Sequence, residues 1–412
     1  MKCKFCNTTV EKPTFDIGNT AISNDLIPKD RLNSLEKTYP LIFYVCPLCL
    51  LAQTEQYKEG YEIFGDDYVY FSSYSSHWLR HAKQYVEDIT IRLNLDKSSF
   101  VMEVASNDGY LLKNFVEKNI KCLGVEPTRS TAQEAIKKDI PTIIDFFNLE
   151  LAGRFEKEGS QADLIIANNV MAHVPDINDF VASLKKVLKK NGTITIEFPH
   201  LLSLIEKNEF DTIYHEHFFY FSVLALVKIF SKYNLSIYDL DELETHGGSI
   251  RAYIAHTNSN IDKNSDKKNL NRILNKELTY GLDSLEYYRK LQHNAFDIKL
   301  DSLQYLIKNK LDGKRIIAFG AAAKGNTFLN YCGIKSDIIE AVIDETPNKI
   351  GKYLPQSKIP ILPFSSIKNL KPNVIVILPW NHKDEILNKL GFTKEWGCDI
   401  VTFIPKLEVL GW

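Results

Sequence analysis

Short apolar runs alternate with helical segments in two separate parts of this chain, and this alternation constrains the fold more than any other feature. The first series follows a helical segment that begins near residue 77 and contains FVMEVA, CLGVEP, LIIANNV and TITIEFP. The second series contains RIIAF, IIEAVIDE, VIVILPW and DIVTFIP. Strands that alternate with helices form parallel sheets with helices packed on them. We therefore predict an α/β protein with two Rossmann-like units.

The chain has 412 residues, which is more than one hydrophobic core usually organises. A long polar helical stretch from about Lys263 to Lys310 lies between the two series and is predicted to connect two domains. The residues before the first series show little helical periodicity and predict a small module of loops and strands. We place three domains at residues 1–66, 67–300 and 301–412.

Acidic and basic residues are nearly balanced, since 50 Lys and Arg stand against 52 Asp and Glu. They are spread along the chain, so neither nucleic acid nor a membrane surface is an expected partner. The first residues, MKCKFCNTT, lack the apolar run of a signal peptide, and no apolar stretch is long enough to span a bilayer. We expect a cytoplasmic protein that is a monomer or a homodimer.

Four of the seven cysteines form two CxxC pairs, Cys3 with Cys6 and Cys46 with Cys49. A two-residue spacing lets one turn direct both thiolates at a tetrahedral ion. An odd number of cysteines in a long chain suits metal ligation better than disulfides. We predict a closed, structural zinc site, with buried thiols or a redox dithiol as the alternative. The gap of 39 residues between the pairs predicts that the segment between them loops out.

The first strand of the central series ends in a turn of small residues that suits a nucleotide cofactor. The sequence from Glu103 to Gly109 is EVASNDG, and such a turn brings backbone N–H groups and a helix N-terminus close to a ligand. Glu126 ends the next strand, where a carboxylate can accept hydrogen bonds from two ribose hydroxyls. Asp145 and Phe146 follow the third apolar run, where an acid and an aromatic suit an adenine.

This order of positions favours S-adenosylmethionine over a nicotinamide, although a surface glutamate and a core phenylalanine would explain either position separately. The predicted cofactor-binding residues are Glu103, Ala105, Asn107, Gly109, Glu126, Asp145, Phe146, Asn168, Asn169 and His173.

Four polar side chains interrupt the aromatic stretch FDTIYHEHFFYFS, namely Tyr214, His215, Glu216 and His217. Such groups are costly in apolar surroundings unless they are paired or used. The two histidines are two residues apart and do not share a helix face, which excludes a HExxH metal site. A regular strand would direct the histidines away from the other two side chains, so a joint role requires an irregular loop.

Methylation of carbon requires removal of a proton next to a ketone and stabilisation of the enolate, and His and Tyr supply these two functions. A core histidine whose hydrogen bonds go to the backbone is the alternative for one of the two histidines.

The chain resembles the sugar C-methyltransferases that act on nucleotide-linked 4-keto deoxysugars in antibiotic and surface-polysaccharide pathways. The resemblance covers nearly the whole chain. It is carried by the two CxxC pairs and by YFSSYS at 70–75, EVASNDG at 103–109, NNVMAHVPD at 168–176, YHEH at 214–217, THGGSIR at 245–251, GAAAKG at 320–325 and PWN at 379–381.

This resemblance implies a zinc-binding domain (1–66), an S-adenosylmethionine-dependent methyltransferase domain (67–300) and a C-terminal Rossmann-like domain that binds the nucleotide sugar (301–412). The expected substrate is a 4-keto deoxysugar linked to dTDP or GDP. It further implies that His217 is the catalytic base, and that Tyr214 and Glu216 assist it.

The resemblance also places a tyrosine of the N-terminal YFSSYS region near the sugar, and we favour Tyr70 over Tyr68 and Tyr74. The GAAAKG turn follows a strand and precedes a helix, so it can hold a phosphate with Lys324 as a point charge. The resemblance implies that this phosphate belongs to the nucleotide; a close-packed turn without a ligand is the alternative. The predicted substrate-binding residues are His246, Gly248, Ser249, Arg251, Ala322, Lys324, Trp380 and Asn381. For the segment from Thr245 to Ser249, a tight turn without a ligand is an equal alternative.

Two positions depart from the family. Ala105 stands where the family usually has glycine, and residues 49–53 read CLLAQ where the family has CGLVQ. The methyl group of Ala105 can crowd the cofactor if the backbone approaches it closely. Three other functions stay open: an O- or N-methyltransferase of a small metabolite, an NAD-dependent sugar oxidoreductase, and a zinc scaffold with a silent methyltransferase domain.

Overall fold

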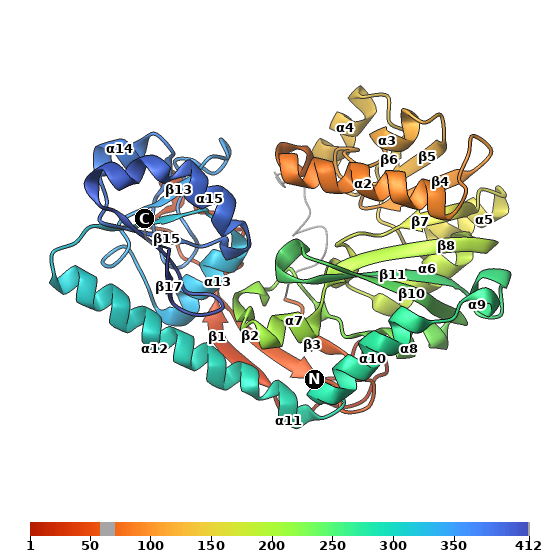
Figure 1. Cartoon of the computed structure of the whole chain (residues 1–412), viewed down its shortest axis with the longest axis horizontal. Coiled ribbons are helices and arrows are strands. Elements are labelled where there is room, and N and C mark those ends of the chain that lie inside the picture. Colours follow the sequence, from red (N-terminus) through yellow and green to blue (C-terminus); the bar gives the residue numbers. More distant parts are fainter. Residues whose placement is uncertain (58–70, 411–412) are drawn as a thin grey trace.

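The computed structural model describes residues 1–57 and 71–410. Within these residues the strands form three sheets. Figure 1 shows the central and C-terminal domains side by side, with the N-terminal strands lying below and between them. The predicted substrate contact Tyr70 and its neighbour Tyr68 lie outside the described residues.

The N-terminal sheet has the order β1-β2-β3-β9 and is antiparallel. Its first three strands are β1 (Phe15–Thr20), β2 (Tyr39–Val45) and β3 (Ala52–Thr54). The fourth, β9 (Phe219–Tyr220), comes from the central part of the chain and directly follows the YHEH segment. The predicted zinc module therefore shares a sheet with the predicted catalytic motif.

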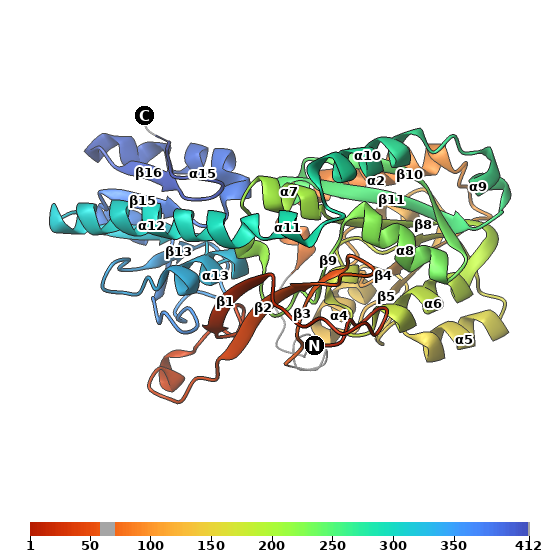
Figure 2. The ribbon, with the colours of Figure 1, turned by 90° about the horizontal axis from the view of Figure 1, so that it is seen from below.

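Residues 21–38, which we call the β1–β2 loop, extend from this sheet to the C-terminal domain (Figure 2). Ile27 and Tyr353 exchange two backbone hydrogen bonds of 2.9 Å. The Lys358 Nζ donates to the backbone oxygen of Leu32 at 2.9 Å, and the Gln356 N–H donates to the Glu36 carboxylate at 2.6 Å. The segment between the CxxC pairs does loop out, as predicted, and it docks on a distant domain.

The central sheet has the order β10-β11-β8-β7-β4-β5-β6. Five neighbouring strands, β8, β7, β4, β5 and β6, pair in parallel, as predicted, and their apolar residues are buried. The pairs β8 with β11 and β11 with β10 are antiparallel, and the sequence did not predict these last two strands. The bounds are β4 (Phe100–Val104), β5 (Lys121–Val125), β6 (Thr142–Ile143), β7 (Ala162–Ile166), β8 (Leu188–Pro199), β10 (Leu235–Leu243) and β11 (Ser249–His256).

Helices cover both faces of this sheet (Figure 1). The predicted helix near residue 77 is α2 (Ser76–Arg92), which begins where the Ser75 side chain accepts a hydrogen bond from the Trp78 N–H. The other helices of this part are α3 (Lys113–Val116), α4 (Arg129–Lys137), α5 (Leu149–Lys157), α6 (Ile177–Val187), α7 (Leu201–Glu206), α8 (Val223–Lys232) and α9 (Asn260–Asn264).

The predicted connector forms three helices, α10 (Lys268–Tyr280), α11 (Leu285–Tyr288) and α12 (Lys290–Leu311). The predicted division at residue 300 falls inside α12, which runs without a break into the C-terminal domain. Figure 2 shows α12 along the outside of the molecule.

The C-terminal sheet has the order β14-β13-β12-β15-β16-β17 and is parallel except for β17. All four strands predicted from the second series are present. The bounds are β12 (Ile316–Phe319), β13 (Val342–Asp344), β14 (Ile361–Pro363), β15 (Val374–Ile377), β16 (Asp399–Thr402) and β17 (Glu408–Val409), with α13 (Ala323–Cys332), α14 (Ser366–Leu370) and α15 (Lys383–Lys389).

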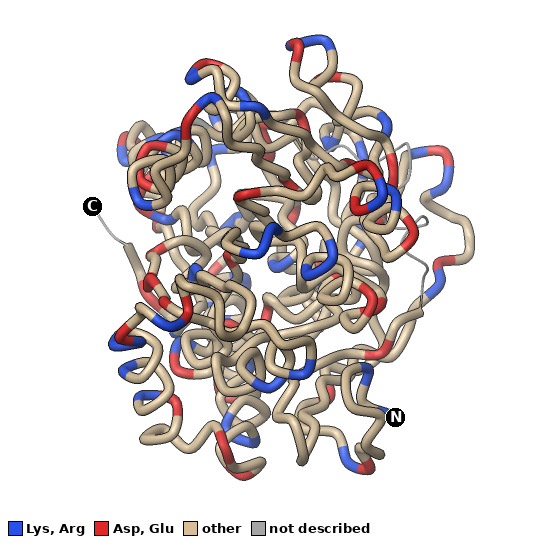
Figure 3. The backbone as a smooth tube through the Cα atoms, turned by 90° about the vertical axis from the view of Figure 1, so that its right-hand side faces the viewer, with Lys and Arg blue, Asp and Glu red and all other residues tan. Residues whose placement is uncertain are grey.

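Acidic and basic residues are interspersed over the whole molecule (Figure 3). Among the residues that the structure describes, no helix is both long enough and apolar enough to cross a bilayer.

Candidate active site

The four cysteines of the CxxC pairs converge on one point. Their sulfur atoms lie within 4.8 Å of one another, with 3.6 Å between Cys3 and Cys49 and 3.5 Å between Cys6 and Cys46. Four thiolates about 2.3 Å from a tetrahedral zinc ion lie roughly 3.8 Å apart. The Gln53 side-chain amide donates to the Cys3 sulfur at 3.3 Å and so can orient this ligand. The cluster therefore fits a structural zinc ion.

The YHEH segment is an irregular loop that the N-terminal domain holds in place. It follows a 3-10 turn at Phe210–Thr212 and precedes β9. The Thr54 hydroxyl, on β3, donates to the backbone oxygen of His217 at 2.8 Å. From the β1–β2 loop, the backbone and side-chain N–H groups of Asn24 donate to the Glu216 carboxylate at 3.2 and 3.1 Å. The zinc-binding part thus contacts the motif at two separate points.

The His217 ring has a defined hydrogen-bonding arrangement. Its Nδ1 lies 3.0 Å from the backbone oxygen of Thr212, so Nδ1 carries the proton and donates it. Its Nε2 lies 2.8 Å from the Tyr214 hydroxyl, which can therefore donate to the Nε2 lone pair. The His173 ring packs 4.7 Å from the His217 ring, and its Nδ1 lies 2.6 Å from the backbone oxygen of Glu216.

Burial holds the pKa of His217 well below its usual range, and the nearby His173, His246 and Lys324 lower this pKa further. The imidazole is therefore neutral at physiological pH, with an unprotonated Nε2. A neutral imidazole beside a hydroxyl is the state that a general base requires before it takes a proton.

One large cavity, of about 650 Å³, connects the predicted cofactor site with this motif. Tyr214, His217, His246 and Lys324 line one part of it. The predicted cofactor residues that line the remainder are Ala105, Asn107, Glu126, Phe146, Asn168, Asn169 and His173. The cavity is large enough for a nucleoside cofactor together with a second molecule.

The turn after β4 has a left-handed backbone at Ala105 and binds the Glu126 carboxylate. Ala105 has a φ of 55° and Asn107 one of 51°, both in the left-handed region that favours glycine. This accounts for the glycine that the resembled family usually has at the position of Ala105. The Glu126 carboxylate accepts hydrogen bonds from the backbone N–H groups of Asn107 and Thr128, each at 2.9 Å, so it is fixed at the mouth of the turn.

Buried polar atoms in this region fit a polar ligand. The Asn168 side-chain oxygen and both polar side-chain atoms of Asn169 are buried without a hydrogen bond, and both residues line the cavity. An adenosine cofactor supplies the hydrogen-bonding groups that these atoms lack.

Lys324, on α13 of the C-terminal domain, lines the cavity. Its Nζ lies 2.9 Å from the Asn381 side-chain oxygen and 4.4 Å from the centre of the Trp380 ring. The Trp380 indole N–H in turn donates to Asp211 at 2.8 Å. Burial raises the pKa of Asp211 to about 6, although Lys324 and Trp380 oppose the shift. Burial likewise raises the pKa of the neighbouring Glu209 to about 8.

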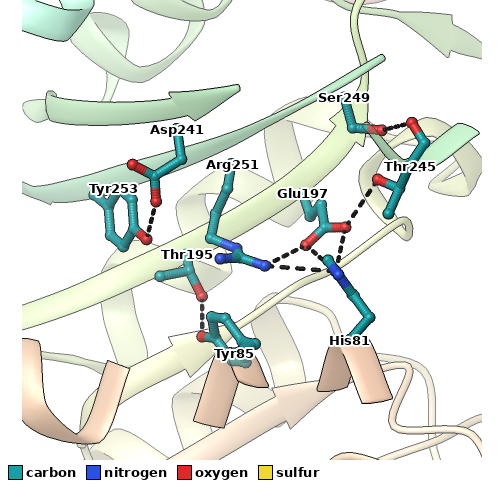
Figure 4. A network of polar contacts seen from close by, with 9 residues as sticks. All are labelled: His81, Tyr85, Thr195, Glu197, Asp241, Thr245, Ser249, Arg251 and Tyr253. Atoms are coloured by element: carbon teal, nitrogen blue, oxygen red, sulfur yellow. Dashed lines mark hydrogen bonds and ion pairs between the residues drawn. The ribbon is translucent and has the colours of Figure 1, made fainter. Parts of the chain in front are cut away.

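A second network supports the wall of the cavity (Figure 4). The fully buried Glu197 on β8 accepts hydrogen bonds from His81 at 2.8 Å and from Arg251 at 3.0 Å. The His81 ring stacks on Trp78, with 4.9 Å between their centres, and Trp78 contacts the His246 ring edge-on. The network therefore holds Trp78 and His246 against the cavity.

The structure does not bring all the predicted residues to this cavity. Glu103, Gly109 and Asp145 are not among the residues that line it, and Asp145 pairs with Arg154 at 3.0 Å. Arg251 pairs with Glu197 and faces the ring of Tyr85. Of the predicted substrate residues, only His246 and Lys324 are among those that line the cavity; Gly248, Ser249, Ala322, Trp380 and Asn381 are not.

Sequence reasoning missed several residues that line or support the cavity. Trp78 and Thr128 line the cavity, Asn24 contacts Glu216, and Glu209 lies beside Lys324. The position of Thr128, two residues after Glu126, was a usable signal. The others depend on contacts between distant segments, for which the sequence carries no local pattern.

Three domain families match the chain in order. Residues 3–64 match a zinc binding domain, residues 78–240 a methyltransferase domain, and residues 244–405 the C-methyltransferase C-terminal domain. The C-methyltransferase NovU of Streptomyces niveus is 28% identical over 410 residues, which cover 99% of this chain and 96% of that protein. The chain is thus a methyltransferase, and it is similar to a C-methyltransferase along nearly its whole length.

The methyltransferase is accordingly an S-adenosylmethionine-dependent enzyme with an N-terminal zinc-binding domain, as predicted. Two solved structures are also similar to it. Magnesium protoporphyrin IX methyltransferase (ChlM) from Synechocystis is 14% identical with a TM-score of 0.33, and the match covers 48% of this chain and 89% of the ChlM chain. The PH0226 protein from Pyrococcus horikoshii is 12% identical with a TM-score of 0.37, and the match covers 49% of this chain and 100% of the PH0226 chain.

Proposed function

We propose that this enzyme methylates a carbon next to the ketone of a nucleotide-linked 4-keto deoxysugar. The observation that carries the proposal is the neutral, hydrogen-bonded His217 beside Tyr214 at one part of a cavity whose remainder fits a nucleoside cofactor. Methylation of oxygen or nitrogen does not require a base that removes a proton from carbon. The sugar substrate and its carrier, dTDP or GDP, follow from the resemblance to sugar C-methyltransferases.

S-adenosylmethionine, when bound, supplies an electrophilic methyl group on a sulfonium. The residues that would hold it are Asn107 and Glu126 at the ribose, Phe146 at the adenine, and Asn168 and Asn169 beyond them. Each of these lines the cavity.

The proton step falls to the YHEH motif. Nε2 of His217 takes the proton from the carbon next to the ketone, and the electrons of that C–H bond move into an enolate. The Tyr214 hydroxyl, which donates to Nε2 in the free enzyme, leaves this lone pair when the substrate binds and donates to the ketone oxygen, which becomes the enolate oxygen. S-adenosylmethionine, if held by the residues named above, would supply the methyl group to this enolate carbon, with its sulfur as the leaving group. Glu216, held by Asn24, keeps the motif in position.

The nucleotide part of the substrate is expected at the GAAAKG turn. Lys324 brings a positive charge to the cavity from this turn, and Asn381 and Trp380 hold its side chain. This arrangement suits a diphosphate that enters between the central and C-terminal domains.

The enzyme is to be incubated with S-adenosylmethionine carrying a ¹³C-labelled methyl group and a panel of dTDP- and GDP-linked 4-keto-6-deoxysugars. The expected product of at least one sugar has a ¹³C methyl group bonded to carbon next to the ketone, as seen by NMR. A methyl group on oxygen or nitrogen would instead favour the alternative methyltransferase. Turnover that depends on NAD and not on the methyl donor would favour the sugar oxidoreductase.

Replacing Glu126 by glutamine is expected to weaken S-adenosylmethionine binding by about 10- to 100-fold, because a hydrogen bond to a charged acceptor contributes about 1.5–3 kcal/mol. Titration calorimetry measures this directly. Asp145→Asn is the comparison, since Asp145 lies outside the cavity lining and pairs with Arg154. Equal losses in the two variants would contradict the assignment of Glu126 to the ribose.

Replacing Asn24 by alanine is expected to lower kcat about tenfold, because its side-chain amide donates a hydrogen bond to the Glu216 carboxylate. The KM for the sugar should change less than kcat, since Asn24 acts through Glu216. Asn33→Ala, an exposed change in the same β1–β2 loop, is the matched control. If both variants lose the same activity, the loop acts only through folding.

A further inference from the structure

The helix α12 carries apolar side chains on two faces. One face packs into the protein through Leu291, Ala295, Ile298 and Leu306. On the outer face, Phe296, Leu300, Ile307 and Leu311 are exposed by 51, 50, 47 and 83%. Their spacings of four, seven and four residues place them in one stripe along the helix. Figure 2 shows that α12 itself runs along the outside of the molecule. Large apolar side chains gathered in this way mark an interaction surface.

The stripe is symmetric about its own centre. Phe296 and Leu311 have their midpoint between Leu303 and Gln304, and so do Leu300 and Ile307. An identical helix that runs in the opposite direction therefore places Leu300 opposite the partner's Ile307, and Phe296 opposite the partner's Leu311. A surface that is complementary to its own reverse is the requirement for a two-fold dimer.

The charges beside the stripe obey the same symmetry. Asp297 and Asp301 lie in its first half and Lys308 in its second half, on the same flank of the helix, because 100° per residue places them within about 40° of one another. All three residues are exposed, and no ion pair within the described part of the chain involves them. In an antiparallel pair about the same midpoint, Lys308 lies between the partner's Asp297 and the partner's Asp301, about 3 Å along the axis from each.

We propose that a second copy of this chain docks on this face, with α12 packed antiparallel against α12 about a two-fold axis between Leu303 and Gln304. The apolar pairs form the seam, and the Lys308 contacts with Asp297 and Asp301 occur twice and set the register. No residue of α12 is among those that line the cavity, so the proposal does not depend on the substrate.

Sedimentation equilibrium of the zinc-loaded full chain, from about 1 to about 500 micromolar, is expected to show a concentration-dependent dimer. Leu300→Ser combined with Ile307→Ser should make the chain monomeric while leaving methyl transfer unchanged. A wild type that stays monomeric over the whole range would overturn the proposal. A dimer that survives the double substitution would overturn it as well, because its interface would lie elsewhere.

Charge exchange tests the register. Lys308→Glu alone places a glutamate between two aspartates of the partner, and Asp297→Lys with Asp301→Lys places two lysines beside the partner's Lys308, so each variant alone should dimerise at least tenfold more weakly. An equimolar mixture of the two should recover the wild-type affinity, because every facing pair then has opposite charge. Failure of the mixture to recover, with both variants weakened, would overturn the antiparallel register.

Discussion

Replacing His217 by alanine is expected to lower kcat for methyl transfer by about 10²- to 10⁴-fold, the usual contribution of a positioned general base. The neutral Nε2, which lies 2.8 Å from the Tyr214 hydroxyl, is the proton acceptor in this mechanism. The rate is measured with saturating S-adenosylmethionine and the sugar found in the product panel. Unchanged affinity for the methyl donor and an unchanged thermal midpoint show that the fold is intact. A kcat within threefold of the wild type would contradict the role of His217.

The same base fixes the pH dependence. Because burial and neighbouring positive charge hold the pKa of His217 below its usual range, the base is already unprotonated in the free enzyme at pH 6.5. The acid limb of kcat/KM that belongs to this base should therefore lie below pH 6.5. A limb with a midpoint above pH 7 would mean that a different group accepts the proton.

Replacing Cys46 by serine is expected to remove zinc and to lower the thermal midpoint by more than about 10 °C, since metal binding and folding are coupled in such sites. Activity should fall with it, because β3 from this domain pairs with β9 directly after the YHEH motif. Zinc content is measured by mass spectrometry of the metal, and unfolding by calorimetry. Cys398→Ser is the control, because Cys398 is a buried thiol of the C-terminal domain away from the cluster. A Cys46→Ser enzyme that keeps one zinc per chain would contradict the site.

Local patterns predicted the elements that local physics determines. Apolar runs such as those around Val101 and Ile375 became buried parallel strands, since strands buried on both faces need continuous apolar sequence. The CxxC spacing predicted the cysteine cluster, because a tight turn can aim two thiolates at one point. A regular strand would point the side chains of Tyr214 and His217 to opposite faces, so we predicted an irregular loop for this segment. The structure has such a loop, which follows the 3-10 turn at Phe210–Thr212.

What depends on contacts between distant segments was not predictable. The partner of Arg251 is Glu197, a residue of the neighbouring strand, so its charge is used within the sheet. Asn24 reaches Glu216 only because the β1–β2 loop docks on the C-terminal domain. The domain boundary that we predicted at residue 300 falls inside α12. The helical periodicity of the sequence continues through this position, so it carries no signal of a boundary.

The most direct test of the account is exchange of the substrate proton for deuterium. The enzyme is incubated in D₂O with the nucleotide-linked 4-keto sugar and S-adenosylhomocysteine, so that no methyl group is available, and the sugar is followed by NMR. We expect deuterium to enter at the carbon next to the ketone at least a hundredfold faster with the wild type than with His217→Ala. No exchange above the rate without enzyme, together with a methylated product whose new methyl group is on oxygen or nitrogen, would contradict the central claim.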